Sequence, residues 1–166
     1  MSYIGITEDR LHHILGVARK AYKIAKEMGY DERFARRMFM IGWNHDVGYE
    51  FAEKRAEHAG LSAELLCALR GGFDVMTYPL YEDKECEDAV SAVRNHGRYT
   101  GHETAEWKIL NMADMLIDSK GKEVTVSQRL EDIRNRYGEH SDQYLTACDI
   151  CYRIGLTGVN NASNIT

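Results

Sequence analysis

Proline is nearly absent from this sequence, whose 166 residues include only Pro79. Long apolar runs are absent as well: the stretch from Met38 to Trp43 is far shorter than the roughly 20 residues that span a bilayer. The N-terminus, MSYIGITEDR, lacks the basic and then apolar order of a signal peptide. We therefore expect a helix-rich protein of the cytoplasm without a membrane segment.

The sequence also lacks an excess of basic residues. Its 21 Lys and Arg are outnumbered by 26 Asp and Glu, which gives a formal net charge of -5. Proteins that coat nucleic acids or membrane surfaces need a basic surface, so the composition argues against both of these partners. A small anionic substrate is still compatible with it, provided that cationic side chains gather locally.

Paired cysteines are missing too. Four cysteines are scattered along the chain without a metal-binding or disulfide pattern, and we expect them to be reduced thiols of the core. They are Cys67, Cys86, Cys148 and Cys151.

Apolar residues recur with a helical period along most of the chain, and no segment alternates as a strand does. Capping residues and glycines set the expected ends. The sequence predicts an all-α fold, a compact bundle of about six or seven helices over residues 1–156, followed by a polar tail, 157–166. The expected helices span 8–28, a segment that follows Asp31, 57–69, 84–96, 103–119, 128–137 and 141–154. The second helix carries His45 on its inward row, and a loop containing Pro79 precedes the fourth. Thr125 or Ser127 caps the sixth helix, and Ser141 caps the seventh.

Four histidines and two aspartates fall on the inward rows of these helices or at their ends. Taken singly, an inward histidine is more often a hydrogen-bonded core residue than a ligand, and a buried aspartate can simply cap a helix. Taken together, imidazole nitrogens and carboxylate oxygens are what a divalent metal requires. The set is His13, His45, Asp46, His58, His96 and Asp114.

Ligation without cysteine leaves room for bound water, whose pKa a divalent metal lowers toward neutrality, so the predicted site suits hydrolysis. Six ligands are enough for one or two ions. We expect iron or manganese, with zinc, cobalt, nickel or magnesium as alternatives.

The order His13, then His45-Asp46, then Asp114 resembles the HD superfamily of metal-dependent phosphohydrolases. The flanking segments Arg10-Leu-His-His13, Asn44-His45-Asp46-Val-Gly48 and Ala113-Asp114 are similar to segments of that family. The resemblance implies that His13, His45, Asp46 and Asp114 hold a first metal, with Asp46 as the bridging carboxylate. It further implies that His58 and His96 match the extra histidines of the dinuclear branches, which include bacterial enzymes that split diadenosine tetraphosphate symmetrically.

The resemblance implies a hydrolase that acts on a nucleotide or another small phosphate ester or anhydride. In that mechanism a hydroxide held by the metal attacks phosphorus, and Asp46 is the catalytic carboxylate that holds the metals and orients the nucleophile. The alternative is a non-catalytic HD-like domain that binds a nucleotide or a metal in a regulatory role. The apolar helices also leave homodimerisation open.

Four charged residues are candidates for substrate binding. Lys54 and Arg55 follow the His-Asp pair, where Gly48-Tyr49 replaces the glycine-lysine of some relatives, and Arg98 lies just beyond His96. Asp118, one helical turn after Asp114, could take a water or a substrate hydroxyl. For each of them the competing interpretation is an ordinary solvated surface charge.

Overall fold

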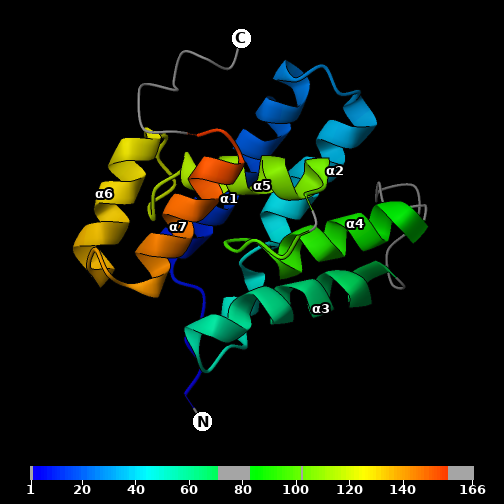
Figure 1. Cartoon of the computed structure of the whole chain (residues 1–166). Coiled ribbons are helices and arrows are strands. Elements are labelled where there is room, and N and C mark those ends of the chain that lie inside the picture. The colour runs from blue at the N-terminus through cyan, green and yellow to red at the C-terminus, as the bar shows by residue number, and fades with distance from the viewer. Residues whose placement is uncertain (1, 71–82, 102, 157–166) are drawn as a thin grey trace.

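The structure, a computed structural model, describes residues 2–70, 83–101 and 103–156 (Figure 1). Within these ranges the chain forms α-helices, two short 3-10 helices and no strand; Ile117 and Glu123 form an isolated bridge. The predicted all-α class is confirmed. The loop around Pro79 and the tail 157–166 lie outside the described residues, so the predicted domain boundary stays a prediction.

The helices agree with the predicted segments and differ mainly at their ends. They are α1 (Glu8–Glu27), α2 (Glu32–Asn44), η1 (Val47–Glu50), η2 (Arg55–Glu57), α3 (His58–Arg70), α4 (Asp83–Arg94), α5 (Ala105–Met115), α6 (Val126–Tyr137) and α7 (Asp142–Arg153). Side-chain oxygens cap several N-termini: Asp31 accepts the Phe34 N–H, Thr125 that of Gln128, and Ser141 that of Tyr144. Each of these caps satisfies a backbone donor that the helix itself leaves free.

Two predicted helix ends are wrong. The fifth helix stops at Met115 rather than at residue 119, because the chain turns at Leu116 and pairs Ile117 with Glu123. Asp118 therefore lies in a turn, not on the helix one turn after Asp114. The fourth helix stops at Arg94, which leaves His96 in the turn that follows it.

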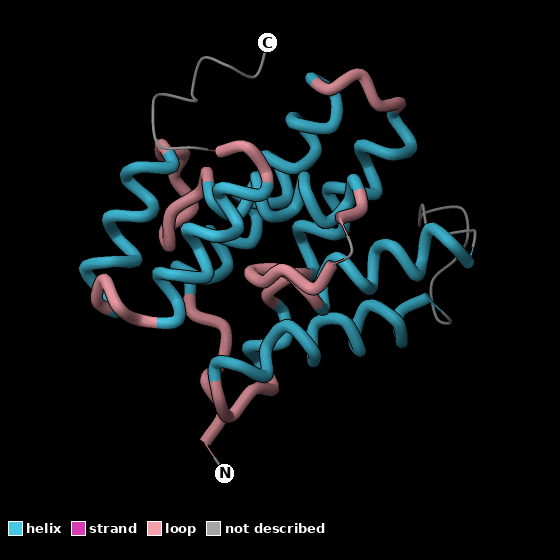
Figure 2. Tube along the Cα trace, viewed as in Figure 1, coloured by secondary structure: helices cyan, strands magenta, loops and turns pink. Residues whose placement is uncertain are grey.

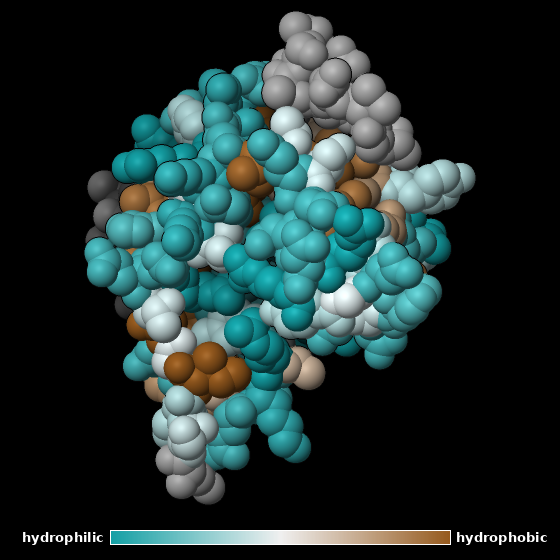
Figure 3. Space-filling view, turned by 90° about the vertical axis from the view of Figure 1, so that its left-hand side faces the viewer, coloured by the Kyte–Doolittle hydropathy of each residue, from teal (hydrophilic) through white to brown (hydrophobic). Residues whose placement is uncertain are grey.

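Three helix pairs surround a central helix. α1 packs with α2, α3 with α4, and α6 with α7, while α5 contacts α1, α2, α4 and α7 (Figures 1 and 2). Trp107, Ile109 and Leu110 of α5 are buried in the core that these helices share. The face that carries α6 is largely hydrophilic, with small separate hydrophobic areas (Figure 3). None of the described helices is both long enough and apolar enough to cross a membrane.

A glycine lets α1 and α2 approach closely. A Cβ atom on Gly42 would lie 2.7 Å from the Cα of Ala18, so this position in α2 accepts no side chain. Since His13 is on α1 and His45 directly follows α2, the same close approach brings these two histidines together at the end of the helix pair.

Candidate metal centre

Five separate parts of the chain meet at one centre, the histidine–aspartate cluster. His13 comes from α1, the pair His45-Asp46 directly follows α2, and three other parts supply His58, His96 and Asp114. His13, His45, Asp46 and His96 are buried, whereas the Asp114 side chain is 21 % exposed, in a cavity. All six residues that the sequence singled out as ligands thus lie together.

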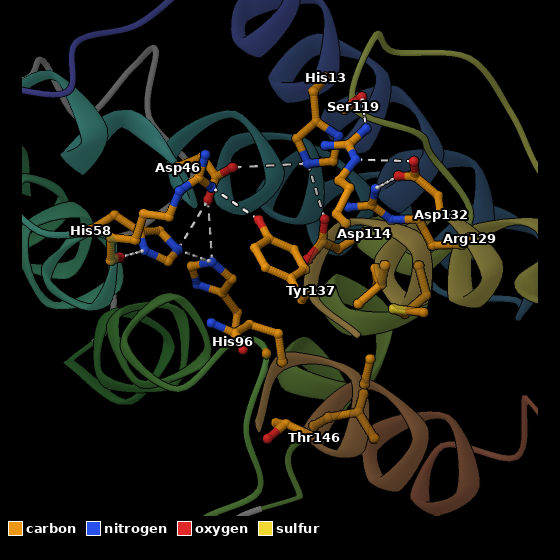
Figure 4. A pocket seen from close by; sticks show the side chains of 18 of the residues that line it. His13, Asp46, His58, His96, Asp114, Ser119, Arg129, Asp132, Tyr137 and Thr146 are labelled. Carbon is orange, nitrogen blue, oxygen red and sulfur yellow. Dashed lines mark hydrogen bonds and ion pairs between the residues drawn. The ribbon is translucent and has the colours of Figure 1, made fainter. Parts of the chain in front are cut away.

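The two carboxylate oxygens of Asp46 face different partners. Oδ2 lies 3.5 Å from His45 Nε2 and 3.9 Å from His13 Nε2. Oδ1 lies 3.4 Å from His58 Nε2 and 3.3 Å from His96 Nε2. Figure 4 shows His58 and His96 on one side of Asp46, with His13 and Asp114 on the other. Asp46 therefore stands between two groups of ligand atoms.

Each of the four histidines is oriented by its own backbone partner. Nδ1 of His13 lies 2.8 Å from the carbonyl oxygen of Asp118. Nδ1 of His45 and Nδ1 of His96 each lie 2.6 Å from a backbone carbonyl oxygen. His58 makes the same kind of contact with Arg55. A carbonyl oxygen can only accept, so Nδ1 carries the hydrogen and Nε2 of a neutral ring presents its lone pair to the cluster. For His13 the nearest carboxylate is Asp114, whose Oδ1 lies 3.0 Å from Nε2. This is how metal-binding histidines are commonly held.

The donor set fits divalent metal ions at two positions. The buried Nε2 of His45 has no hydrogen-bond partner among the described residues. Nε2 of His58 and Nε2 of His96 are 3.1 Å apart, and two lone pairs that face each other at this distance need a proton or a metal between them. Ligand atoms of two groups each lie within 4.8 Å of one another: His13, His45 and Asp46 form one group, and Asp46, His58 and His96 the other.

Burial and charge together set the protonation of the cluster. Burial lowers the pKa of His45 to about 4, so this ring is neutral at pH 7. Burial would raise the pKa of the Asp46 carboxyl, but His45 and His96 hold that pKa well below its usual range. Asp114 behaves similarly, because His13 outweighs burial and lowers its pKa. Both carboxylates are therefore ionised, as metal ligands must be.

Arg10 and Tyr49 brace the residues around Asp46. Arg10 donates to Asp46 Oδ2 at 2.6 Å, and its guanidinium lies 4.4 Å from the centre of the Tyr49 ring. Tyr49 in turn stacks on His58, with ring centres 4.2 Å apart. The turn between Asp46 and Tyr49 needs a glycine at position 48, because a Cβ atom on Gly48 would clash with the carbonyl oxygen of His58.

Helix α5 holds the turn that carries His96. Asn111 accepts the Gly97 N–H at 2.8 Å, and Trp107 Nε1 donates to the carbonyl oxygens of Asn95 and Arg98. The turn is thus bonded on both sides of His96 to the helix that also supplies Asp114. These bonds fix the position of His96 relative to Asp114.

A cavity of about 440 Å³ opens from the cluster toward α6 and α7. Its volume is within the range typical of small-molecule sites, about 300 to 1,000 Å³. Four arginines line it, namely Arg10, Arg55, Arg129 and Arg136. Met115, Ile133, Ala147 and Ile150 also line it, together with Gln143 and Thr146. The cavity thus brings arginines, apolar side chains and the acids Asp132 and Asp142 together next to the cluster.

Of the four residues predicted to bind substrate, one lines the cavity and three do not. Arg55 lines the cavity, where it donates to the hydroxyl of Tyr137 at 3.3 Å. Lys54, Arg98 and Asp118 do not line it, so their predicted contact with substrate gains no support from the geometry. Asp118 instead accepts the backbone N–H groups of Lys120 and Lys122 and orients His13 through its carbonyl oxygen.

Sequence reasoning did not single out Arg10, Tyr49 or Arg129 as site residues. Arg10 had a usable signal, because it precedes His13 by three positions and so shares its helix face. Arg129 and Arg136, seven positions apart on α6, also share a face. Which face of α6 meets the site depends on tertiary packing, so no local pattern marked these residues.

The family model described as HD domain matches residues 10–131, almost three quarters of the chain. The chain belongs to the HD domain family. Members of this family are generally metal-dependent hydrolases that bind divalent metals, and the His and Asp cluster of this HD domain could hold such a metal. No curated protein and no solved structure matches the chain.

Proposed function

We propose that this HD domain is a metal-dependent phosphohydrolase that acts on a nucleotide or another small phosphate ester or anhydride. One observation carries the proposal. The four histidines are each fixed at Nδ1 by a backbone carbonyl. Nε2 of His45, His58 and His96 each lie within 3.5 Å of an oxygen of one carboxylate, Asp46. Nε2 of His13 lies 3.0 Å from Asp114 Oδ1 and 3.9 Å from Asp46 Oδ2. Such an arrangement matches two metals that share a bridging carboxylate.

In this proposal His13, His45, Asp46 and Asp114 would hold one ion, and Asp46, His58 and His96 would hold a second. Iron or manganese is the expected metal, since nitrogen and carboxylate oxygen ligands suit both. Bound metals would supply Lewis acidity, which activates water and offsets charge on the phosphoryl oxygens.

The chain's own residues then define the rest of the site. Arg10 keeps the Asp46 carboxylate in place through its 2.6 Å contact, so the shared ligand cannot rotate freely. Asn111 and Trp107 keep His96 at its position. Arg55 lies on the cavity wall and can approach a phosphate oxygen of the substrate.

The direct test measures phosphate release by protein purified without chelator and supplied with manganese or iron. Substrates should include nucleoside mono-, di- and triphosphates, diadenosine tetraphosphate and a simple phosphate monoester. We expect release from at least one substrate, and we expect Asp46→Asn to abolish it. If the metal-loaded protein hydrolyses none of them but binds a nucleotide, the regulatory alternative replaces this proposal.

A further inference from the structure

Arg129 of α6 is a shielded cation that makes only one weak hydrogen bond to the described residues. Its side chain is 14 % exposed and lines the cavity. Its hydrogen bond to a described residue is a 3.5 Å contact with Asp132 Oδ2, at the outer limit of such a bond, and its Nε has no hydrogen-bond partner there. Asp114 also interacts with it electrostatically, without a hydrogen bond to it. A guanidinium has five N–H donors, and a cation held out of water in this state is costly.

Asp132 does not neutralise Arg129 well because it serves another residue. Its Oδ1 accepts Arg136 Nε at 3.0 Å, and Arg136 also donates to Ser119 at 2.7 Å. Arg136 is thus anchored at two points and fixes the Asp132 carboxylate. Arg129, three positions before Asp132, lines the cavity with few of its donors bonded to described residues.

The position of Arg129 relative to the cluster indicates which anion suits it. Figure 4 shows Arg129 and Asp132 on the same side of the cavity as His13 and Asp114, away from His58 and His96. An anion that reaches both Arg129 and the cluster must carry oxygens in more than one direction, as a tetrahedral phosphate does. The planar guanidinium fork matches two oxygens of one phosphate group.

We propose that Arg129 is a phosphate-binding residue of this site, and that the organic part of the substrate lies beyond it, between α6 and α7. This inference rests on the proposed function and makes its substrate more specific. Besides Arg129, the cavity lining includes apolar side chains, namely Ile133 of α6, Ala147 and Ile150 of α7, and Met115 of α5. That lining favours an organic phosphate ester, such as a nucleotide, over an inorganic polyphosphate.

The test is equilibrium binding of inorganic phosphate, measured by calorimetry on full-length protein purified without chelator. Arg129→Ala should weaken binding by about ten- to a hundredfold, the range of charge-assisted hydrogen bonds. Arg129→Lys, which keeps the charge but loses the fork, should give an intermediate loss. Arg134→Ala is the matched control, because Arg134 is on the same helix, pairs with Glu131 and does not line the cavity. It should bind phosphate as the wild type does.

Metal content, measured on the same samples, separates the possible outcomes. Weaker phosphate binding in Arg129→Ala with unchanged metal content supports the inference. Unchanged binding in Arg129→Ala, equal losses in Arg129→Ala and Arg134→Ala, or loss of metal from Arg129→Ala would each overturn it. Because binding needs no turnover, the result stands even if no substrate is hydrolysed, a failure that would count against the proposed function alone. A wild type that binds no phosphate also contradicts the inference.

Discussion

At the scale of single residues, His45 has the most constrained environment in the cluster. It is fully buried, its Nδ1 donates to the Gly42 carbonyl, and its Nε2 has no partner among the described residues. Burial disfavours the charged ring, whereas Asp114 and Asp46 favour protonation of His13 and His96 strongly enough to outweigh burial there. Four chemically identical side chains therefore differ in how readily they take up a proton.

This difference predicts a titration order in protein freed of metal. The ring of His45 should stay neutral down to about pH 4, while His13 and His96, whose pKa values are raised, take up protons at higher pH. Histidine ring signals followed by NMR from pH 8 to pH 4 would measure this. If His45 titrates together with His13, burial does not lower the pKa of His45.

The same pKa values determine how the stability of the folded protein changes with pH. An unfolded His45 would bind a proton near its ordinary pKa of 6.5, and the folded one near 4. Between these values the unfolded state holds more protons, so the His45 contribution to stability is lost as the pH falls from about 6.5 to about 4. His13 and His96 act in the opposite direction, because their folded pKa values are raised.

At the scale of elements, the bonds between α5 and the 95–98 turn have a measurable role. Asn111→Ala should remove the acceptor of the Gly97 N–H, lower the free energy of unfolding by about 1 to 2 kcal/mol, and weaken metal binding at His96. Ser141→Ala removes the cap of α7 and should cost about 1 kcal/mol without changing metal affinity. Denaturant unfolding together with metal titration distinguishes the two. Equal metal affinities in both variants would show that Asn111 does not position His96.

The elements also show what the sequence could predict. Helix starts were predictable because Asp31, Thr125 and Ser141 cap through local hydrogen bonds. The end of α5 was not, because the turn after Met115 depends on Gly121, which packs against the His12 backbone of α1. The six predicted ligands could be found together because they share inward rows and a family pattern. Arg129 could not, because its role depends on how α6 packs against the cavity.

At the scale of the whole molecule, a buried ion network joins three helices. Arg37 of α2 donates to Glu85 of α4 at 2.9 Å and to Glu106 of α5 at 2.7 Å. Arg37→Met should lower the free energy of unfolding by roughly 3 to 5 kcal/mol, because it leaves the buried Glu106 carboxylate without its arginine. Glu85 keeps its 2.7 Å contact with Arg33. Denaturant unfolding measures this, and Arg36→Met, on the exposed face of α2, is the control. A loss below 1 kcal/mol would show that the network contributes little.

Metal binding should stabilise the whole fold as well. The proposed ligands come from α1, the end of α2, α3, the turn after α4 and α5, so an unfolded chain cannot present them together. A metal concentration one hundred times the dissociation constant adds about 2.7 kcal/mol. Thermal unfolding with manganese and with chelator should differ by several degrees. No difference would mean that the folded chain binds the metal no better than the unfolded one.

The number of metal ions per chain is the most direct test of the shared Asp46. Elemental analysis of protein purified without chelator and loaded with manganese or iron should give about two ions per wild-type chain. It should give about one ion for His58→Gln or His96→Gln, and close to none for Asp46→Asn. Wild-type protein that holds no metal, or an ion count that Asp46→Asn leaves unchanged, would contradict the account.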